Sequence, residues 1–497
     1  MSEQSQESVV RTYGGWRREQ SVGLGAFSLG QSLAVLVVGF SLVMVNLWAG
    51  WRWSALFALG AVAVAAATLW KDRYGMNFFN RKSERMRFLK AKRKGRTGVR
   101  AGVLSAQRKS DGRCRLPGVL GKVSLTSHVD AYRRPFGMLR HSDGHVTIVL
   151  GIAPDGERLK DKSQIDDLVS AFGSWLACLS NEVGLIAASI TVETSPESGQ
   201  RLRAKVRSQR GCEVPDVAQE VIEGVLAATD CTGARISCWA TLSFEPANLG
   251  KGKQAVDEIA TRLPTLTQTL VAGGAGAVHV MDRAEIAQMA RIAYDPGVEA
   301  LIESAAAKGQ QVEIEWEDAG PGTKLEGWDA FRHDSAISCT WVQRVAPRGT
   351  VQHRSLRRLL EATNQVPRKR VTMIYRPLDP ARAPDVVERA VDRADSRLRL
   401  RGKRATARLK RDLAQAVQTT TEEASGASIL DFGLIITATA SGPDADARMV
   451  DAIAAVESMA SASRFTMRPA FGSQGIAFAM GLPLGVLPHQ QSWLAEA

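Results

Sequence analysis

The sequence lacks the phosphate-binding loop Gly-x-x-x-x-Gly-Lys-Ser/Thr, in which backbone amides cradle phosphates and the lysine meets the terminal ones. The glycine–lysine segments that begin at Gly121, Gly250 and Gly402 have neither its hydroxyl residue nor its upstream glycine. We therefore expect no ATP hydrolysis by this chain alone. Its six cysteines include no Cys-x-x-Cys pair and have no histidine at zinc-ligand spacing. Reduced thiols are expected, with no metal and no cofactor.

Ionisable side chains are absent from Gln20 to Trp51. Within that stretch the run Ala26–Trp48 is long enough for the ~20 helical residues that a bilayer core requires. A second uncharged run, Trp53–Trp70, stands at the short end of that range and follows the aromatic turn Trp48-Ala49-Gly50-Trp51-Arg52-Trp53. The two runs predict a transmembrane hairpin over residues 22–70.

Tryptophans cluster at both ends of the predicted hairpin, where indole rings settle at membrane interfaces. The predicted membrane-interface residues are Trp16, Trp48, Trp51, Trp53 and Trp70. A cleaved secretory signal is the first alternative, but the apolar run exceeds the usual ~7–15 residues and no small-residue cleavage site follows it. A buried helical hairpin of a globular core is the second alternative, and it leaves the tryptophans unexplained.

The positive charge of the chain is concentrated near its amino terminus. Residues 1–110 hold 18 basic and 5 acidic residues, so their net charge of +13 equals that of the whole chain. Excess Lys/Arg keeps the flank of a span cytoplasmic, so we expect a multi-pass protein of the inner (plasma) membrane with both termini in the cytoplasm. The anionic leaflet is the expected partner of this block, and its predicted lipid- or partner-binding residues are Arg81, Lys82, Arg85, Arg87, Lys92, Arg93, Lys94 and Arg96.

The remainder of the chain alternates between strand and helix patterns. Apolar residues at helical spacing over Ile165–Val183 precede the strand pattern Ile186–Thr194, and Val217–Ala228 precedes Arg235–Phe244 in the same way. This alternation is typical of ferredoxin-like split units. The predicted fold class is α+β, an amino-terminal two-helix transmembrane hairpin plus cytoplasmic ferredoxin-like α/β modules. The predicted regions are a tail (1–21), the hairpin (22–70), a basic linker (71–111) and three modules (112–250, 251–350 and 351–497).

A polar, helix-favouring stretch between Ala381 and Ala424 contains eight basic residues and no acid from Arg397 to Arg411. Such a run is usually a solvated helix face or a hairpin tip. The alternative is a docking surface for an acidic partner or for phosphates. Aromatic residues that would stack on bases are absent from it, which disfavours single-strand binding. The candidate docking residues are Arg397, Arg399, Arg401, Lys403, Arg404 and Arg408.

Catalytic candidates are weak. His333-Asp334-Ser335 holds the three residue types of a hydrolase triad, but a triad needs side chains from separate elements. His141 and His145 flank an Asp-Gly turn and have no third metal ligand nearby. Gly273-Gly274-Ala275-Gly276 precedes a strand pattern, which favours a tight helix-to-strand loop over a dinucleotide turn. We predict no catalytic residue and no enzymatic activity.

Four short segments carry a family resemblance. They are Thr12-Tyr13-Gly14-Gly15-Trp16-Arg17-Arg18, Trp328-Asp329-Ala330-Phe331-Arg332-His333-Asp334-Ser335, Arg368-Lys369-Arg370-Val371-Thr372 to Tyr375-Arg376-Pro377, and Ala477-Phe478-Ala479-Met480-Gly481-Leu482-Pro483-Leu484-Gly485. Together they resemble an actinobacterial family of conjugal-transfer integral membrane proteins. In layout that family is similar to a PrgI- or VirB-type membrane hairpin fused to the non-ATPase amino-terminal half of the VirB-type conjugation ATPase.

The resemblance implies a non-enzymatic inner-membrane scaffold of a type IV-like conjugative DNA-transfer (plasmid transfer, secretion) apparatus, oligomeric within its complex. Because the sequence ends twelve residues after Gly485, we expect a VirB-type secretion ATPase to be recruited in trans, beside other channel subunits. One alternative is a membrane subunit of an actinobacterial type VII secretion complex. The other is a membrane-tethered nucleic-acid-binding protein, although DNA is not the favoured partner.

Overall fold

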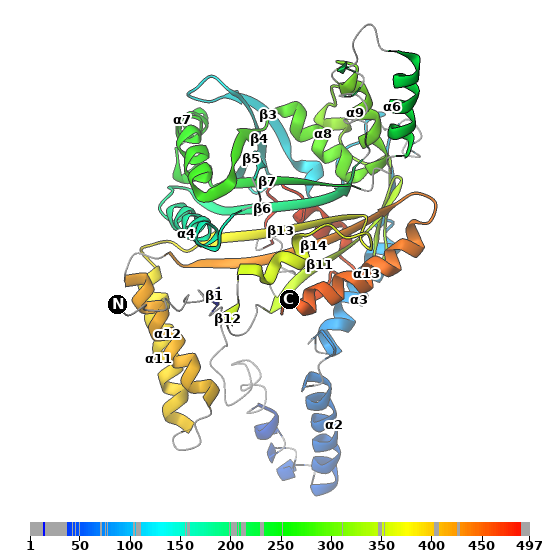
Figure 1. Cartoon of the computed structure of the whole chain (residues 1–497). Helices are drawn as coiled ribbons and strands as arrows, with labels where there is room; N and C mark the ends of the chain where they lie inside the picture. The colour runs from blue at the N-terminus through cyan, green and yellow to red at the C-terminus, as the bar shows by residue number, and fades with distance from the viewer. Residues whose placement is uncertain are drawn as a thin grey trace, which may run out of the picture.

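A computed structural model of the whole chain shows one large sheet with helices on both of its faces (Figure 1). The structure describes residues 13–14, 37–69 (except 42, 45 and 49), 72–102 (except 75 and 77), 105, 111–154, 156, 160–197, 199, 206, 208–209, 215–228, 233–310 (except 251), 312–345, 350–401 (except 352), 407–424 and 428–488.

Thirteen strands form the sheet, in the order β2-β9-β10-β11-β14-β13-β6-β7-β5-β4-β3, with β15 beside β11 and β8 beside β5. Every pairing in it is antiparallel. A separate short pair joins β1 (Tyr13–Gly14) to β12 (Thr350–Val351). The strands of the large sheet are β2 (Gly98–Arg100), β3 (Ser124–Val129), β4 (Pro135–Arg140), β5 (Val146–Ala153), β6 (Leu185–Pro196), β7 (Ala234–Phe244), β8 (Ala277–Val280), β9 (Thr323–Glu326), β10 (Phe331–His333), β11 (Ala336–Val345), β13 (Arg368–Pro377), β14 (Leu430–Ser441) and β15 (Thr466–Pro469).

Two halves of this sheet repeat one topology. In the first half, strands β5, β6, β7 and β8 lie in the spatial order β8-β5-β7-β6. In the second half, strands β11, β13, β14 and β15 lie in the order β15-β11-β14-β13. Numbered along the chain, each half reads 4-1-3-2, the order of a split strand–helix–strand unit. We call these halves module A and module B.

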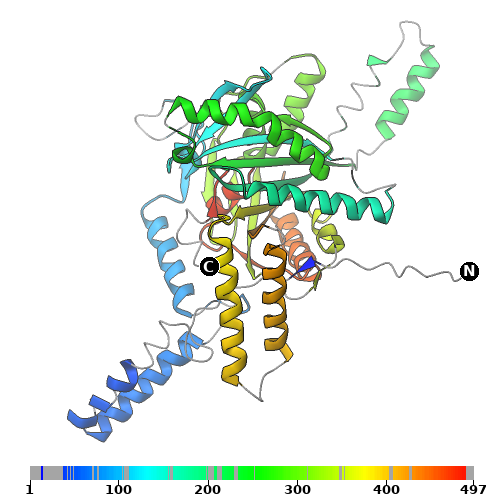
Figure 2. The same cartoon turned by 90° about the vertical axis from the view of Figure 1, so that its left-hand side faces the viewer.

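The two modules meet edge to edge, because β6 pairs with β13 from Lys369↔Thr194 to Tyr375↔Ala188. This pairing is antiparallel, so the modules are related by an approximate two-fold rotation. Each module has an insertion between its second and third strands, and the rotation sends the two insertions to opposite ends of the sheet. Module A inserts α6 (Asp216–Ala228), and module B inserts the hairpin of α11 (Ala383–Arg401) and α12 (Ala407–Ala424) (Figures 1 and 2).

Helices cover both faces of the sheet. On one face, α4 and α7 close an apolar core in module A, and α10 and α13 close another in module B. On the other face, α8, α14 and the segment 482–486 form a core with both modules. These core helices are α4 (Lys162–Leu179), α7 (Lys253–Leu270), α8 (Arg283–Tyr294), α10 (Arg357–Leu360), α13 (Ala445–Ala462) and α14 (Gln474–Met480). A further helix, α9 (Glu299–Ala307), follows α8 along the chain.

Several local predictions are confirmed. The strand predicted over Ile186–Thr194 is β6, the helix over Val217–Ala228 is α6, and the helix over Ile165–Val183 is α4. The glycine-rich segment after α7 ends in Gly276, which has a φ of 68° and directly precedes β8. It is the predicted helix-to-strand loop. The predicted Asp-Gly turn between His141 and His145 joins the antiparallel strands β4 and β5.

The predicted fold class is wrong. Among the described residues no helix is long and apolar enough to cross a membrane. Of the predicted spans, residues 26–36 lie outside the described residues, and the second corresponds to α2 (Trp51–Leu69), which has 19 residues. Arg52 lies in the first turn of α2, and alanine, which contributes only a methyl group, recurs through it. The observed architecture is the thirteen-stranded antiparallel sheet with its helices.

The predicted localisation is corrected with it. A multi-pass arrangement with both termini in the cytoplasm depended on residues 22–70 forming two spans, and the described helices supply none.

Candidate functional site

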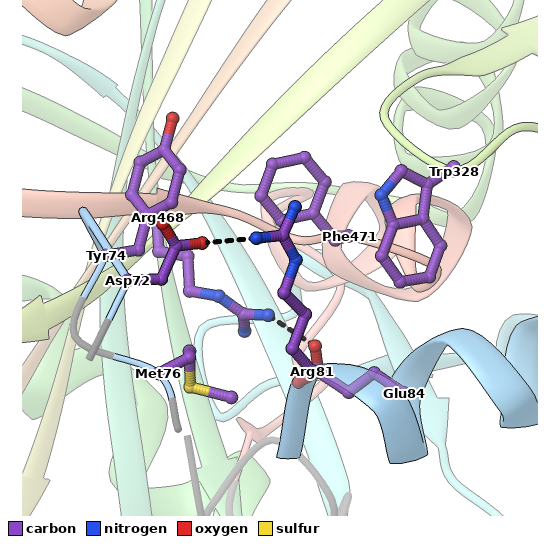
Figure 3. A pocket seen from close by; sticks show the side chains of 8 residues that line it. All are labelled: Asp72, Tyr74, Met76, Arg81, Glu84, Trp328, Arg468 and Phe471. Atoms are coloured by element: carbon purple, nitrogen blue, oxygen red, sulfur yellow. Dashed lines mark hydrogen bonds and ion pairs between the residues drawn. The ribbon is translucent and has the colours of Figure 1, made fainter. Parts of the chain in front are cut away.

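The basic segment that follows α2 is held against module B. Its helix α3 (Phe78–Arg93) lies beside a small cavity of about 70 Å³ between the chain before α3 and the end of β15 (Figure 3). The cavity is lined by Asp72, Tyr74, Met76, Arg81, Glu84, Trp328, Arg468 and Phe471. Segments from three distant parts of the sequence thus meet at this one place.

Ion pairs and ring contacts join α3 to the body. Glu84 accepts a hydrogen bond at 2.5 Å from Arg468, the penultimate residue of β15. Phe88 packs edge-on against Trp328 with ring centroids 5.5 Å apart, and Trp328 stacks on Phe471 at 5.7 Å. Since Glu84 and Phe88 are one helical turn apart and both half-buried, a single face of α3 contacts the body and the opposite face is turned to solvent.

The solvent face of α3 is basic and apolar together. Phe79, Met86 and Leu89 are exposed there. Arg81 is engaged at the inner side, where it donates to Asp72 at 3.0 Å. The other predicted basic residues of this region are all exposed: Lys82, Arg85, Arg87, Lys92, Arg93, Lys94 and Arg96. The structure therefore presents a positively charged surface with apolar side chains on a helix of fixed orientation, which we call the α3 face.

Three of the predicted interface tryptophans are described, and all three are exposed. Trp48, Trp51 and Trp53 are 91%, 72% and 64% exposed. Trp16 and Trp70 lie outside the described residues.

The α11–α12 hairpin is the second basic surface (Figure 2). Arg399 is exposed at its far end and pairs with Asp395 at 2.7 Å, while Arg397 is half-buried. Lys410 and Arg411 are exposed near the start of α12. Of the other predicted docking residues, Lys403 and Arg404 lie outside the described residues, and Arg401 and Arg408 are described by backbone alone.

The charges of α12 oppose its helix dipole. The amino terminus of a helix carries partial positive charge, so cations there are unfavourable and anions favourable. The first turn of α12 has no acidic residue. Lys410 and Arg411 follow directly, ahead of a single carboxylate at Asp412, and Glu422 and Glu423 lie in the last turn. The stability of the helix does not explain this arrangement.

A buried ion-pair network lies where the two modules join. Glu193 of β6 accepts hydrogen bonds from Arg368 at 2.8 Å and from Arg370 at 2.7 Å, both on β13. Arg368 also pairs with Glu299 of α9, and Arg235 of β7 donates to another α9 carboxylate, Glu303, at 2.9 Å. Burial alone would raise the pKa of Glu193, but the two guanidinium groups outweigh it and hold that pKa below its usual value.

His333, Asp334 and Ser335 do not form a triad. The imidazole of His333 lies between the carbonyl oxygen of Tyr294 and the hydroxyl of Ser338, and burial lowers its pKa to about 4. Asp334 instead accepts from the backbone amides of Gly322 and Thr323. His333 is the last residue of β10, and Asp334 and Ser335 form the turn to β11. Their side chains contact different partners, since Ser335 donates to Asp295.

His141 and His145 stack on each other with ring centroids 3.9 Å apart and hold the segment that follows α14. Nε2 of His145 lies 2.9 Å from the carbonyl oxygen of Gly485, and its Nδ1 lies 2.5 Å from Asp143. Burial and the neighbouring His145 lower the pKa of His141 to about 3. In the described part of the chain, no group of three or more His, Cys, Asp or Glu side chains is arranged to hold a metal ion.

The sequence interpretation missed the residues that position these surfaces. Trp328 and Arg368 lie in segments that carry the family resemblance, but the sequence predicts no structural role for them. Glu193 lies in the predicted strand Ile186–Thr194, for which the sequence predicts no ion pair. A signal was present, because a charge inside a strand of apolar and hydroxyl residues must find an opposite charge when it is buried. Its partner could not be chosen, since Glu193 and Arg368 are 175 residues apart.

Comparison with known protein families and with curated proteins finds no match to this chain.

Proposed function

We propose that this protein is a non-enzymatic scaffold subunit of a type IV-like conjugative DNA-transfer apparatus, and that it recruits a secretion ATPase in trans. The family resemblance of the four boxes motivates the class of machine. The observation that carries the scaffold role is the α3 face, a basic and apolar surface that is fixed to a rigid sheet by the Arg468–Glu84 pair and the Phe88–Trp328 contact.

A docking surface needs both attraction and orientation. Seven exposed basic residues on and after α3 attract an acidic surface over about a Debye length, ~8 Å at physiological salt. Phe79 and Met86 offer apolar area that a partner buries at ~25 cal/mol per Å². Because the opposite face of α3 is packed on the body, a partner bound here is held in a defined orientation relative to the sheet. We assign the α3 face to an acidic surface of the ATPase.

The test is recovery of the ATPase from native cells with the tagged full chain, identified by mass spectrometry after salt washing. We expect a VirB-type ATPase with the wild type and its loss with K82E/R85E/R93E, three substitutions on the α3 face. The matched control K253E/R358E/R448E reverses three exposed charges on other elements and should retain the ATPase.

Three results would overturn the proposal. They are recovery of type VII secretion components in place of the ATPase, equal recovery by the α3 variant and its control, and ATP hydrolysis by the purified protein alone. Binding of duplex DNA that weakens steeply with salt and is lost in K82E/R85E/R93E would assign the α3 face to nucleic acid instead.

A further inference from the structure

The two insertions have opposite charge. Helix α6 carries Asp216, Glu220 and Glu223 and no basic residue. The first half of α12 carries Lys410 and Arg411 on its exposed side. Topology places α6 and α12 at equivalent positions of the two modules, yet one insertion is acidic and the other is basic.

Helix α6 also exposes a stripe of valines. Val217, Val221 and Val225 recur every four residues and are 72%, 59% and 60% exposed. Side chains at this spacing lie on one face of a helix. Valine is a poor helix former, because its branched side chain loses rotamer freedom there. Helix stability does not account for this stripe, and such an exposed apolar surface marks an interaction site.

Helix α12 has a matching stripe. Its exposed residues Lys410, Arg411, Ala414 and Val417 follow helical spacing along one side, and Val417 is 49% exposed. The apolar part of the stripe is therefore bordered by cations, whereas the valine stripe of α6 is bordered by Asp216 and Glu220. The two stripes are opposite in charge, and each exposes apolar side chains.

The two helices of one chain cannot meet. In both views α6 stands above the sheet and the α11–α12 hairpin extends below it, at the far end of the molecule (Figures 1 and 2). This separation follows from the antiparallel β6–β13 pairing, which sends the two insertions in opposite directions. Contact between the stripes thus requires a second copy of the chain.

We propose that copies of this protein associate head to tail, with the valine stripe of α6 in one copy docked on the exposed stripe of α12 in the next. Such an interface is heterologous, so it extends into a ring or a chain of copies instead of stopping at a two-fold dimer. The α3 face takes no part in it, so this proposal goes beyond the ATPase-binding role and is tested by different variants.

The contact is small. Thirteen residues of α6 span roughly 20 Å, and one helix laid on another buries less than the ~1,200 Å² of a standard interface. Association should therefore be in the micromolar range and should weaken as salt screens the charges. We expect the average mass in solution to rise with protein concentration and to fall when salt is added.

The decisive experiment uses two variants of the full chain, each with one broken surface. V217D/V221D destroys the α6 stripe and keeps α12, whereas K410E/R411E reverses α12 and keeps α6. We expect each variant alone to be monomeric and their equimolar mixture to form pairs only, because a single intact interface remains. The measurement is sedimentation velocity from ~1 to ~100 µM, which brackets a contact of this size, in mild detergent that suppresses contact through the exposed side chains of α2.

Controls separate loss of the surface from loss of fold. R358E/R448E should associate as the wild type does, and circular dichroism should show unchanged melting for all variants. The variant D216K/E220K should not associate. Association should return when D216K/E220K and K410E/R411E are placed in the same chain, since the charges of the two stripes are then exchanged. A monomeric wild type at ~100 µM, or dimers of K410E/R411E alone through α6–α6 pairing, would overturn the proposal, as would binding of a DNA oligonucleotide to α12 with no self-association.

Discussion

The junction between the modules and the insertions at their ends are both rich in charge, but they use it in opposite ways. At the junction Glu193, Arg368 and Arg370 are buried and paired with one another. On α12, Lys410 and Arg411 face solvent at the end of the helix where its dipole disfavours them. Buried charges at the junction need opposite charges beside them, so they favour one strand pairing. Exposed charges on α12 do not constrain the fold in this way and can contact another molecule.

The largest expected effect is at the junction. Glu193→Gln leaves the buried guanidinium of Arg370 without a carboxylate and leaves Arg368 with Glu299 alone. Breaking a buried pair in this way costs about 3–5 kcal/mol. Glu303→Gln is the control, because its partner Arg235 is one-third exposed and also lies 3.6 Å from Glu299, so its cost should stay below ~1 kcal/mol. Urea denaturation of both variants checks this, and equal losses would show that the junction gains nothing from burial.

The lowered pKa of Glu193 adds a pH dependence to the same comparison. A carboxyl whose pKa is lower in the folded state stabilises the protein above the unfolded value, ~4.3 for Glu, and this stabilisation is lost as pH falls through the folded value. The wild type and Glu193→Gln should therefore converge in stability below pH ~4. A constant difference between them over the acid range would contradict the ion-pair explanation.

Lys369 lies between the two arginines on β13 and is buried, but its hydrogen-bond acceptor is a backbone carbonyl instead of a carboxylate. Its ammonium donates at 2.6 Å to the carbonyl of Glu361, and burial lowers its pKa to about 8. Because the folded pKa lies below the unfolded ~10.4, the charge opposes folding below pH 8 and stability rises from there to ~10.4. Lys369→Met should be more stable by about 1–3 kcal/mol at pH 7 and should lose this rise.

Denaturation of Lys369→Met and the wild type at several pH values between ~7 and ~10 measures this difference. A less stable Lys369→Met at pH 7 would show that the hydrogen bond to Glu361 outweighs the cost of burying the charge.

A smaller effect is expected where the segment after α14 crosses the sheet. Gly485 has a φ of 74°, and an added Cβ would lie 2.1 Å from Oγ1 of Thr147, which is itself hydrogen-bonded to Ser243. Gly485→Ala should cost about 2–3 kcal/mol through crowding and backbone strain. Gly442 has a φ of 93° with nothing within 4 Å of the added atom, so Gly442→Ala should cost only ~1 kcal/mol. Equal melting temperatures for the two variants would refute the crowding argument.

The smallest effect on stability belongs to α12. K410E/R411E places anions toward the amino terminus of the helix, where each is favoured by up to ~0.3–1 kcal/mol at an exposed site. The variant should therefore melt at or slightly above the wild-type temperature even though it loses self-association. A clear loss of stability would mean that these cations are structural, and the contrast with the junction would disappear.

Prediction from sequence succeeded for elements that are set by local apolar spacing. It failed for features that depend on contacts between residues far apart in the sequence. The helices α4 and α6 and the strand β6 followed from apolar spacing. The same reading of composition produced a transmembrane hairpin, which the described helices do not support. The α3 residues were identified as a basic surface, but the Trp328–Phe471 stack that orients α3 joins residues far apart in sequence and was invisible.

By itself, the sequence determined several helices and strands, such as α4, α6 and β6, and where positive charge is concentrated. It also determined the polar character of α11 and α12. Only the tertiary structure decided that β6 pairs with β13, that two modules share one sheet, and that the insertions point to opposite ends. The physical reason is that helix spacing is local, whereas antiparallel pairing between distant strands depends on burying matched charges and apolar faces together.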